Sequence, residues 1–117
     1  MKEITVDGVV YVPKGAEVAR PFDGMEYKIV RCQNAGVFAG YLESREGQEA
    51  AIRKARRLWY WTGAASLSQM AVEGTSSPDS CKFPAEVDRI TVTDAIEILD
   101  CTSVAQDSIK GVKIWKA

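Results

Sequence analysis

The residues with the most chemical potential lie in one stretch, "ARRLWYWTGAASLSQMAVEG", which runs from Ala55 to Gly74. Two arginines stand directly before a group of aromatic residues. A guanidinium group offers a planar fork of donors that fits phosphate oxygens and also stacks on flat rings. In an extended strand Arg57 shares a face with Trp59 and Trp61, so that one face carries both cation and ring. This pattern favours a nucleotide site that includes Arg56; the alternative is a solvated strand face whose arginines pair with glutamates.

Two neighbouring segments add candidate ligand contacts. The small residues before Ser66 lead into an expected helix, and free backbone N–H groups at a helix start attract anions. The alternative is a small-residue helix that packs tightly on a sheet. Phe83, which precedes Pro84, is either a ring that covers a ligand or the hydrophobic anchor of its loop. The predicted ligand-binding residues are Arg56, Arg57, Trp59, Ser66 and Phe83.

The aromatic residues also have an alternative interpretation as core or as subunit interface. Three tryptophans, four tyrosines and three phenylalanines are many rings for a 12.8 kDa chain to bury alone. Tryptophan, tyrosine and arginine carry much of the binding energy at protein interfaces. We therefore expect a homo-oligomer.

Catalysis and metal binding are both disfavoured by the residue types present. The chain has no histidine, which removes the most frequent general base and the most frequent metal ligand. Cys32, Cys81 and Cys101 are widely spaced and form no C-x-x-C pair, so we expect small buried thiols without a disulfide. The sequence predicts a protein that is not an enzyme and that has no metal and no cofactor.

The charge balance limits the classes of partner. Fifteen basic and sixteen acidic residues give a net charge of −1, whereas proteins that bind long nucleic acids usually show a basic excess. No apolar run approaches the ~20 residues of a membrane span. The N-terminus lacks the pattern of a secretory signal. We therefore expect no long nucleic acid, no membrane partner and a cytoplasmic location.

Turn signals divide the chain into three parts. Asp7-Gly8 suits a two-residue hairpin turn, across which Ile4 and Val6 would face Val9 and Tyr11. The predicted parts are an N-terminal β-hairpin appendage (1–13), a linker rich in proline and glycine (14–24) and a single domain (25–117).

Alternation and capping signals outline the domain. The 49–61 segment is ambiguous between helix and strand, and we interpret it as a third strand because it continues a meander. Gly40 is a possible bulge inside the second strand. Gly74 is placed to end a helix, and Thr102 or Ser103 to begin another. The predicted class is α+β, an antiparallel β-sheet meander with two short helices. The predicted strands are 25–33, 37–44, 49–61 and 112–116, while 86–93 and 94–101 are either one strand or a strand pair.

Between Tyr27 and Trp115 the chain resembles a family of small phage and prophage accessory proteins of unassigned function. The matching stretches are "AGVFAGYLES", "ARRLWYWTGAASLSQMAVEG", "CKFPAEVDRI" and "SIKGVKIWK". The chain also resembles the first family of Thoeris anti-defence proteins. That resemblance implies a small oligomeric α+β protein without catalytic activity, which sequesters a cyclic ADP-ribose signal or a cyclic oligonucleotide in the host cytoplasm. Arg57 and Phe83 have the chemical types that such contacts require.

Two functions follow as expectations. The first is a phage-encoded, non-enzymatic anti-defence protein that binds and sequesters a small cyclic nucleotide immune signal. The second is a phage protein-interaction module, either a structural component or an inhibitor of a host protein, with the aromatic segment as its interface.

Overall fold

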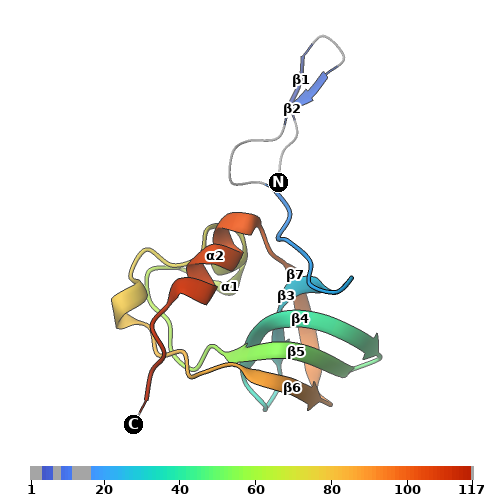
Figure 1. The fold of residues 1–117 in the computed structure, drawn as a ribbon, viewed down its shortest axis with the longest axis vertical. Helices are drawn as coiled ribbons and strands as arrows, with labels where there is room; N and C mark the ends of the chain where they lie inside the picture. The colour runs from blue at the N-terminus through green and yellow to red at the C-terminus, as the bar shows by residue number, and fades with distance from the viewer. Residues whose placement is uncertain (1–3, 7–8, 12–16, 117) are drawn as a thin grey trace.

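The domain is built on a five-stranded antiparallel sheet with two helices packed on one side (Figure 1). The computed structural model describes residues 4–6, 9–11 and 17–116. This architecture confirms the predicted α+β class. No helix in this part of the chain is long and apolar enough to cross a membrane. The elements are β3 (Glu26–Cys32), β4 (Val37–Glu46), β5 (Glu49–Arg57), α1 (Leu67–Glu73), β6 (Val87–Val92), β7 (Ala95–Asp100) and α2 (Ser103–Gly111), with a short 3₁₀ helix at Pro78–Ser80.

The N-terminal strands β1 (Ile4–Val6) and β2 (Val9–Tyr11) pair with each other as predicted. Ile4 is opposite Tyr11, and Val6 is opposite Val9. The turn residues Asp7 and Gly8 lie outside the described residues, as does the first part of the predicted linker.

The second part of the predicted linker lies against the domain. Ala19 N donates to the carbonyl of Cys101 at 3.0 Å, and Ser103 N donates to the carbonyl of Glu17 at 2.7 Å. The side chain of Gln106 bonds both backbone groups of Arg20, at 2.8 and 2.9 Å. Residues 17–20 are therefore attached to the start of α2.

The connection between β6 and β7 forces the sheet to curl. These strands are the two edges of the order β6-β5-β4-β3-β7, yet only Thr93 and Asp94 join them. In a flat sheet, four spacings of about 4.8 Å would hold the edges about 19 Å apart. Three Cα–Cα steps of about 3.8 Å reach only about 11 Å. The sheet must therefore bend until its edges approach each other at this end.

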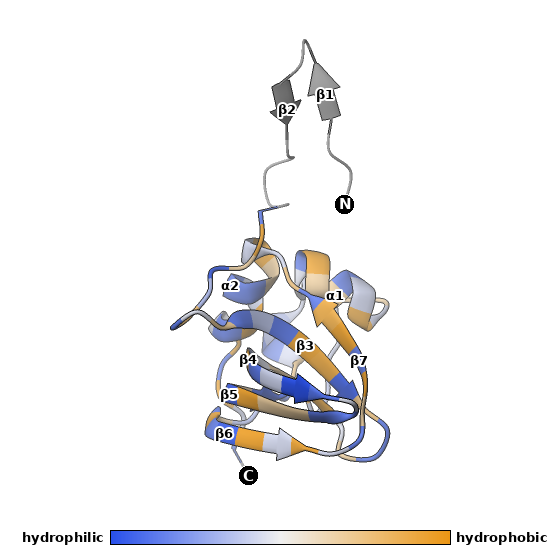
Figure 2. Cartoon of the chain, turned by 90° about the vertical axis from the view of Figure 1, so that its right-hand side faces the viewer, coloured by the Kyte–Doolittle hydropathy of each residue, from blue (hydrophilic) through white to orange (hydrophobic). Residues whose placement is uncertain are grey.

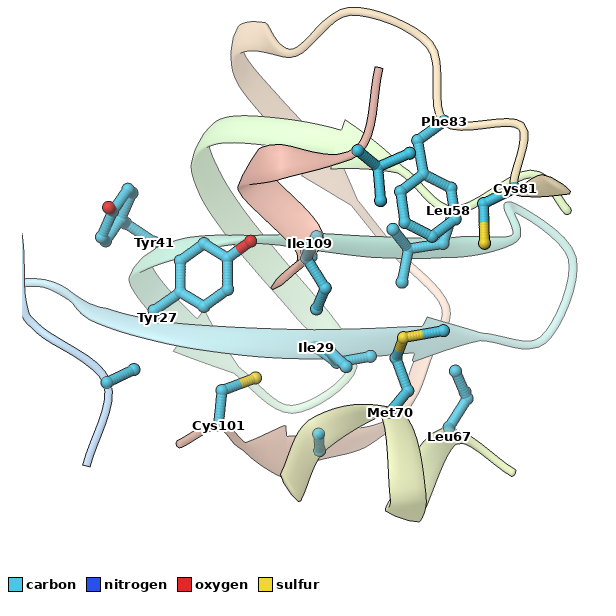
Figure 3. Close-up of a cluster of buried hydrophobic side chains, with 14 residues drawn as sticks. Tyr27, Ile29, Tyr41, Leu58, Leu67, Met70, Cys81, Phe83, Cys101 and Ile109 are labelled. Atoms are coloured by element: carbon cyan, nitrogen blue, oxygen red, sulfur yellow. The ribbon is translucent and has the colours of Figure 1, made fainter. Parts of the chain in front are cut away.

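Curling gives the sheet two apolar cores. The inner core is enclosed by the sheet itself, because all five strands and no helix contribute to it: Val30, Cys32, Phe38, Ala50, Ile52, Ala55, Val92 and Ala95. The outer core lies between the other face and the helices, and includes Ile29, Leu58, Met70, Phe83 and Ile109 (Figure 3). Figure 2 shows both helices on this side of the sheet and the apolar segments of β5, β6 and β7.

A bulge in β5 decides which side chains face which core. The register between β4 and β5 shifts between Ala39 and Tyr41, where Gly40 is opposite an extra residue. That residue is Lys54, with φ at 49°. Regular alternation from Ile52 would send Arg56 into the inner core, but the bulge sends Ala55 inward instead. Arg56 therefore faces the outer side of the sheet.

The close approach of β5 explains why a glycine stands at position 40. A Cβ there would lie 2.7 Å from the Ile52 side chain and 2.8 Å from the Arg53 carbonyl oxygen. The structure confirms an irregularity at Gly40, but the bulged strand is β5 rather than β4, because the extra residue lies opposite the glycine.

Two element boundaries differ from those predicted. β5 ends at Arg57 rather than continuing to Trp61, because the chain turns after Leu58 to place that side chain in the outer core. Residues 112–116 form no strand. They run beside Phe83 and make a single parallel bridge at Ile114, because the segment beside them is itself irregular. The predicted caps are present: Gly74 ends α1 with φ at 75°, and the Thr102 hydroxyl accepts from Ala105 N at the start of α2.

The three cysteines are free and buried, as expected for small apolar side chains. Burial raises the pKa of the Cys101 thiol from its ordinary 9.0 to about 12. Burial also raises the pKa of the Tyr27 hydroxyl in the same core. Both groups are therefore neutral in the folded protein at neutral pH.

We expect the bulge strain to be measurable by comparing two substitutions at one position. A side chain in the left-handed region costs about 1–2 kcal/mol that glycine avoids. Lys54→Gly should therefore be more stable than Lys54→Ala, by about 0.5–1 kcal/mol after the entropy cost of glycine. At Arg53, whose φ is not positive, the alanine variant should instead be more stable than the glycine variant. Urea unfolding of the four variants checks this, and the same order at both positions would contradict it.

Alkaline pH should destabilise the fold. A thiol whose folded-state pKa is raised contributes stability fully below its unfolded pKa, and that contribution is lost as pH rises towards the folded value. Unfolding free energy should therefore fall between about pH 9 and pH 12, the interval set by Cys101. Urea unfolding at intervals through this range measures it. The unfolding free energy of Cys101→Val should fall less steeply with pH than that of the wild type. Equal slopes would show that the Cys101 thiol does not cause the loss of stability.

Candidate functional site

A pocket of about 270 Å³ opens where β3, β4 and β5 meet the end of α2. Its walls combine positive charge, two phenol rings and a small apolar area. The lining residues are Tyr27, Tyr41, Lys54, Arg56, Ala85, Glu86, Lys110, Val112 and Ile114. We call this the cation pocket.

Arg56 is held at the base of the cation pocket by backbone carbonyls from two other segments. Its Nε donates to Pro84 at 3.0 Å, Nη1 to Ile109 at 2.8 Å and Nη2 to Phe83 at 3.1 Å. Only 6% of the residue is exposed. These bonds use three of the five N–H groups of a guanidinium and leave two for the pocket. Burial lowers the pKa of Arg56, but an arginine stays protonated in proteins.

Two lysines enter the pocket from opposite sides. The Nζ of Lys110, at the end of α2, donates to the Tyr41 hydroxyl at 2.7 Å. The same hydroxyl accepts from Gln106 Nε2 at 3.2 Å, so Tyr41 is fixed by α2. The Nζ of Lys54 lies 4.0 Å from the centre of the Phe22 ring, which packs on Tyr41 with ring centroids 5.4 Å apart. Phe22 therefore flanks the pocket beside Lys54.

Tyr27 is a buried residue whose hydroxyl oxygen reaches the pocket, since no side-chain nitrogen or oxygen in the described chain is both buried and without a partner. The residue is 4% exposed and lines the pocket, and its hydroxyl makes no hydrogen bond with residues 17–116. Figure 3 shows Tyr27 and Tyr41 together at one end of the outer core. Because burial raises the pKa of Tyr27, its hydroxyl keeps its proton and can donate to a bound group.

The charge of the cation pocket is unbalanced. Lys54, Arg56 and Lys110 contribute three positive charges against the single carboxylate of Glu86. None of these four residues forms a salt bridge within the structurally described part of the chain, although seven salt bridges occur there. Cations without a salt bridge beside a neutral hydroxyl donor suit a small anion, because charge-assisted hydrogen bonds to phosphate are strong.

Among the predicted ligand contacts, the structure brings Arg56 and Phe83 together. The Arg56 guanidinium carbon lies 5.6 Å from the centre of the Phe83 ring. Phe83, however, has 0% exposure and belongs to the outer core. The anchor interpretation of Phe83 therefore describes it better than the lid interpretation, since a buried ring beneath Arg56 does not cover a ligand.

The other three predicted contacts lie apart from the cation pocket. Arg57 points to the opposite side of β5, where Nη1 donates to the Ala35 carbonyl at 2.6 Å and the guanidinium lies 4.4 Å from the centre of the Phe38 ring. The Ser66 hydroxyl accepts from Gln69 N at 3.3 Å and so caps α1.

Trp59 belongs to an exposed group with Tyr60, Lys82 and Trp115, which we call the tryptophan patch. The Trp59 and Trp115 rings are stacked, with centroids 5.1 Å apart and planes 4° apart. They remain 58% and 38% exposed. Lys82 Nζ lies 5.5 to 5.7 Å from the centres of all three rings. Exposed stacked indoles of this kind are typical of a binding surface.

Sequence reasoning missed most of the cation pocket. Lys110 and Tyr27 are 83 positions apart in the sequence, and only the fold brings them to one place. One signal was present: "RKARR", from Arg53 to Arg57, holds four cations within five residues.

The chain belongs to a family described as a domain of unknown function, DUF6948, which matches residues 25–109. No curated protein and no solved structure matches the chain. The family match covers the sheet and most of α2, and it ends one residue before Lys110.

We expect Arg56→Lys to destabilise the fold strongly. An ammonium group cannot reach three carbonyls at once, and each hydrogen bond lost from a charged donor costs about 1.5–3 kcal/mol. Arg57→Lys is the matched control, because Arg57 is exposed and bonds one carbonyl. It should change stability by less than about 1 kcal/mol. Thermal and urea unfolding measure both variants, and a loss in Arg56→Lys no larger than that in Arg57→Lys would contradict the structural role.

Proposed function

We propose that this protein binds a small nucleotide without converting it, and that it is a phage anti-defence protein that sequesters a cyclic nucleotide immune signal. One observation carries the binding part of the proposal: three cations that form no salt bridge with the described residues line the cation pocket together with the Tyr27 hydroxyl. Phosphate oxygens are the ligand atoms that such a set of donors suits best.

The chemistry of the site favours binding over catalysis. The sequence holds no histidine, and the one carboxylate of the cation pocket has no second carboxylate beside it in the lining. Buried Tyr27 keeps its proton, so it serves as a hydrogen-bond donor rather than as a base. A sequestering protein needs only affinity, which these groups supply.

The signalling part of the proposal rests on the resemblance to Thoeris anti-defence proteins. The ligand would be of the cyclic ADP-ribose type or a cyclic oligonucleotide. A pocket of about 270 Å³ lies just below the ~300–1,000 Å³ of typical small-molecule sites. It accommodates one phosphate and its neighbouring sugar, and the rest of a cyclic nucleotide would contact a second copy in a homo-oligomer.

A second candidate function has its own observation. The tryptophan patch exposes Trp59 and Trp115 side by side, next to Lys82. It supports the alternative of a phage protein-interaction module, in which these rings would contact a virion component or a host protein. In that case Trp59→Ala should abolish capture of a stoichiometric partner from infected cells.

Nucleotide binding should raise the melting temperature. A ligand at about 100 times its dissociation constant adds about 2.7 kcal/mol to the unfolding free energy. We expect this with cyclic ADP-ribose or a cyclic dinucleotide, measured by differential scanning fluorimetry. Lys110→Met should lose most of the shift, and Lys113→Met, which changes an exposed lysine outside the pocket, should keep it. No shift with any of these nucleotides would count against the proposal.

A further inference from the structure

The single acid of the cation pocket stands directly beside its buried arginine. The last pair of the β5–β6 ladder is Ala55 with Val87. Glu86 directly precedes β6 and lines the same pocket as Arg56. Arg56 also fixes the chain two residues earlier, through its bond to the Pro84 carbonyl at 3.0 Å. Glu86 thus lies in a short segment held at one end by the Arg56–Pro84 hydrogen bond and at the other by the start of β6.

An acid at this place opposes phosphate binding unless it has another task. Glu86 is exposed and makes no salt bridge within the part of the chain that the structure describes. Its charge partly offsets the effect of burial on the pKa of Arg56, but its oxygens make no close ionic contact with Lys54 or Arg56 in the described chain and stay free to accept hydrogen bonds. A carboxylate accepts hydrogen bonds from hydroxyl groups, and acids that bind ribose hydroxyls beside a phosphate site are a recurrent arrangement in nucleotide-binding proteins.

We propose that the cation pocket recognises a ribose phosphate unit, with the phosphate at Lys54, Arg56 and Lys110 and the ribose hydroxyls at Glu86. This inference rests on the proposed nucleotide binding and names the portion of the nucleotide that the pocket holds. The Tyr27 hydroxyl donates to the phosphate from the buried end. The apolar side chains of Val112 and Ile114 form the wall against the sugar ring.

The positions of the charged residues in the lining determine the orientation of the bound ligand. Lys110 and Tyr27 are associated with Tyr41, through a hydrogen bond and through ring contact at 5.1 Å. Glu86 instead belongs to the segment that leads into β6. The ligand would therefore lie with its phosphate towards the tyrosines and its sugar towards the start of β6.

The test compares two probes, inorganic phosphate and AMP, on the wild type and on Glu86→Gln by isothermal titration calorimetry. Wild type should bind AMP more tightly than phosphate. In Glu86→Gln the affinity for AMP should fall about tenfold, because a charged hydrogen bond is lost. Phosphate affinity should stay equal or rise, since a repelling charge is removed. Glu46→Gln, which neutralises an exposed acid outside the pocket, is the control and should leave both affinities unchanged.

Cyclic ADP-ribose is titrated in parallel to separate this inference from the proposed function. If cyclic ADP-ribose binds while Glu86→Gln strengthens AMP and phosphate alike, the assignment of Glu86 is overturned and nucleotide binding stands. If AMP binds no more tightly than phosphate, the ribose assignment is overturned. If neither AMP nor cyclic ADP-ribose binds the wild type, both the inference and the proposed function fail.

Discussion

The two-residue connection between β6 and β7 is the constraint on which the rest of the structure depends. It joins strands at opposite edges of one sheet, and a flat sheet would hold those edges too far apart. Asp94 binds the turn between β3 and β4: Gln33 N donates to its carbonyl at 2.9 Å, while its carboxylate accepts from Asn34 N and Ala35 N. These bonds lower the pKa of Asp94 and keep it ionised. The resulting curl separates an inner core of strand residues from an outer core beneath the helices.

The bulge at Lys54 assigns the cations of β5 to the two sides of the curled sheet. Without the extra residue Arg56 would face the small apolar inner core. With it, Arg56 reaches three carbonyls and the base of the pocket, while Arg57 lies over Phe38 on the other side. Lys54 therefore serves both the fold, through its bulge, and the candidate site, through its side chain. Strained backbone at such a position is typical of functional sites, where it fixes a side chain in a useful place.

Local patterns predicted the elements better than the site. The alternation from Met25 onward and the capping residues at Gly74 and Thr102 were sufficient for the strands and helices, because these signals act over a few neighbouring residues. The end of β5 and the C-terminal segment were predicted incorrectly, since tertiary packing determines the conformation at Leu58 and Ile114. Arg56 was recognised as a candidate, but the side of β5 on which it lies was not predicted. A bulge reverses the alternation from which the side of a strand residue is inferred. Glu86 and Lys110 have no local signature at all, and only the curl and α2 bring them to Arg56.

The boundary of the family domain crosses the cation pocket. Tyr27, Tyr41, Lys54, Arg56 and Glu86 lie within residues 25–109, whereas Lys110, Val112 and Ile114 follow it and Phe22 precedes it. The common part thus supplies the deep, charged half of the cavity, and the two ends of the chain supply its rim. Divergence at Phe22, Lys110 and Ile114 alone would alter ligand preference while leaving both cores untouched, because these three residues belong to neither core. In such a protein, specificity can evolve by exchange of short terminal segments, without any compensating change in the sheet.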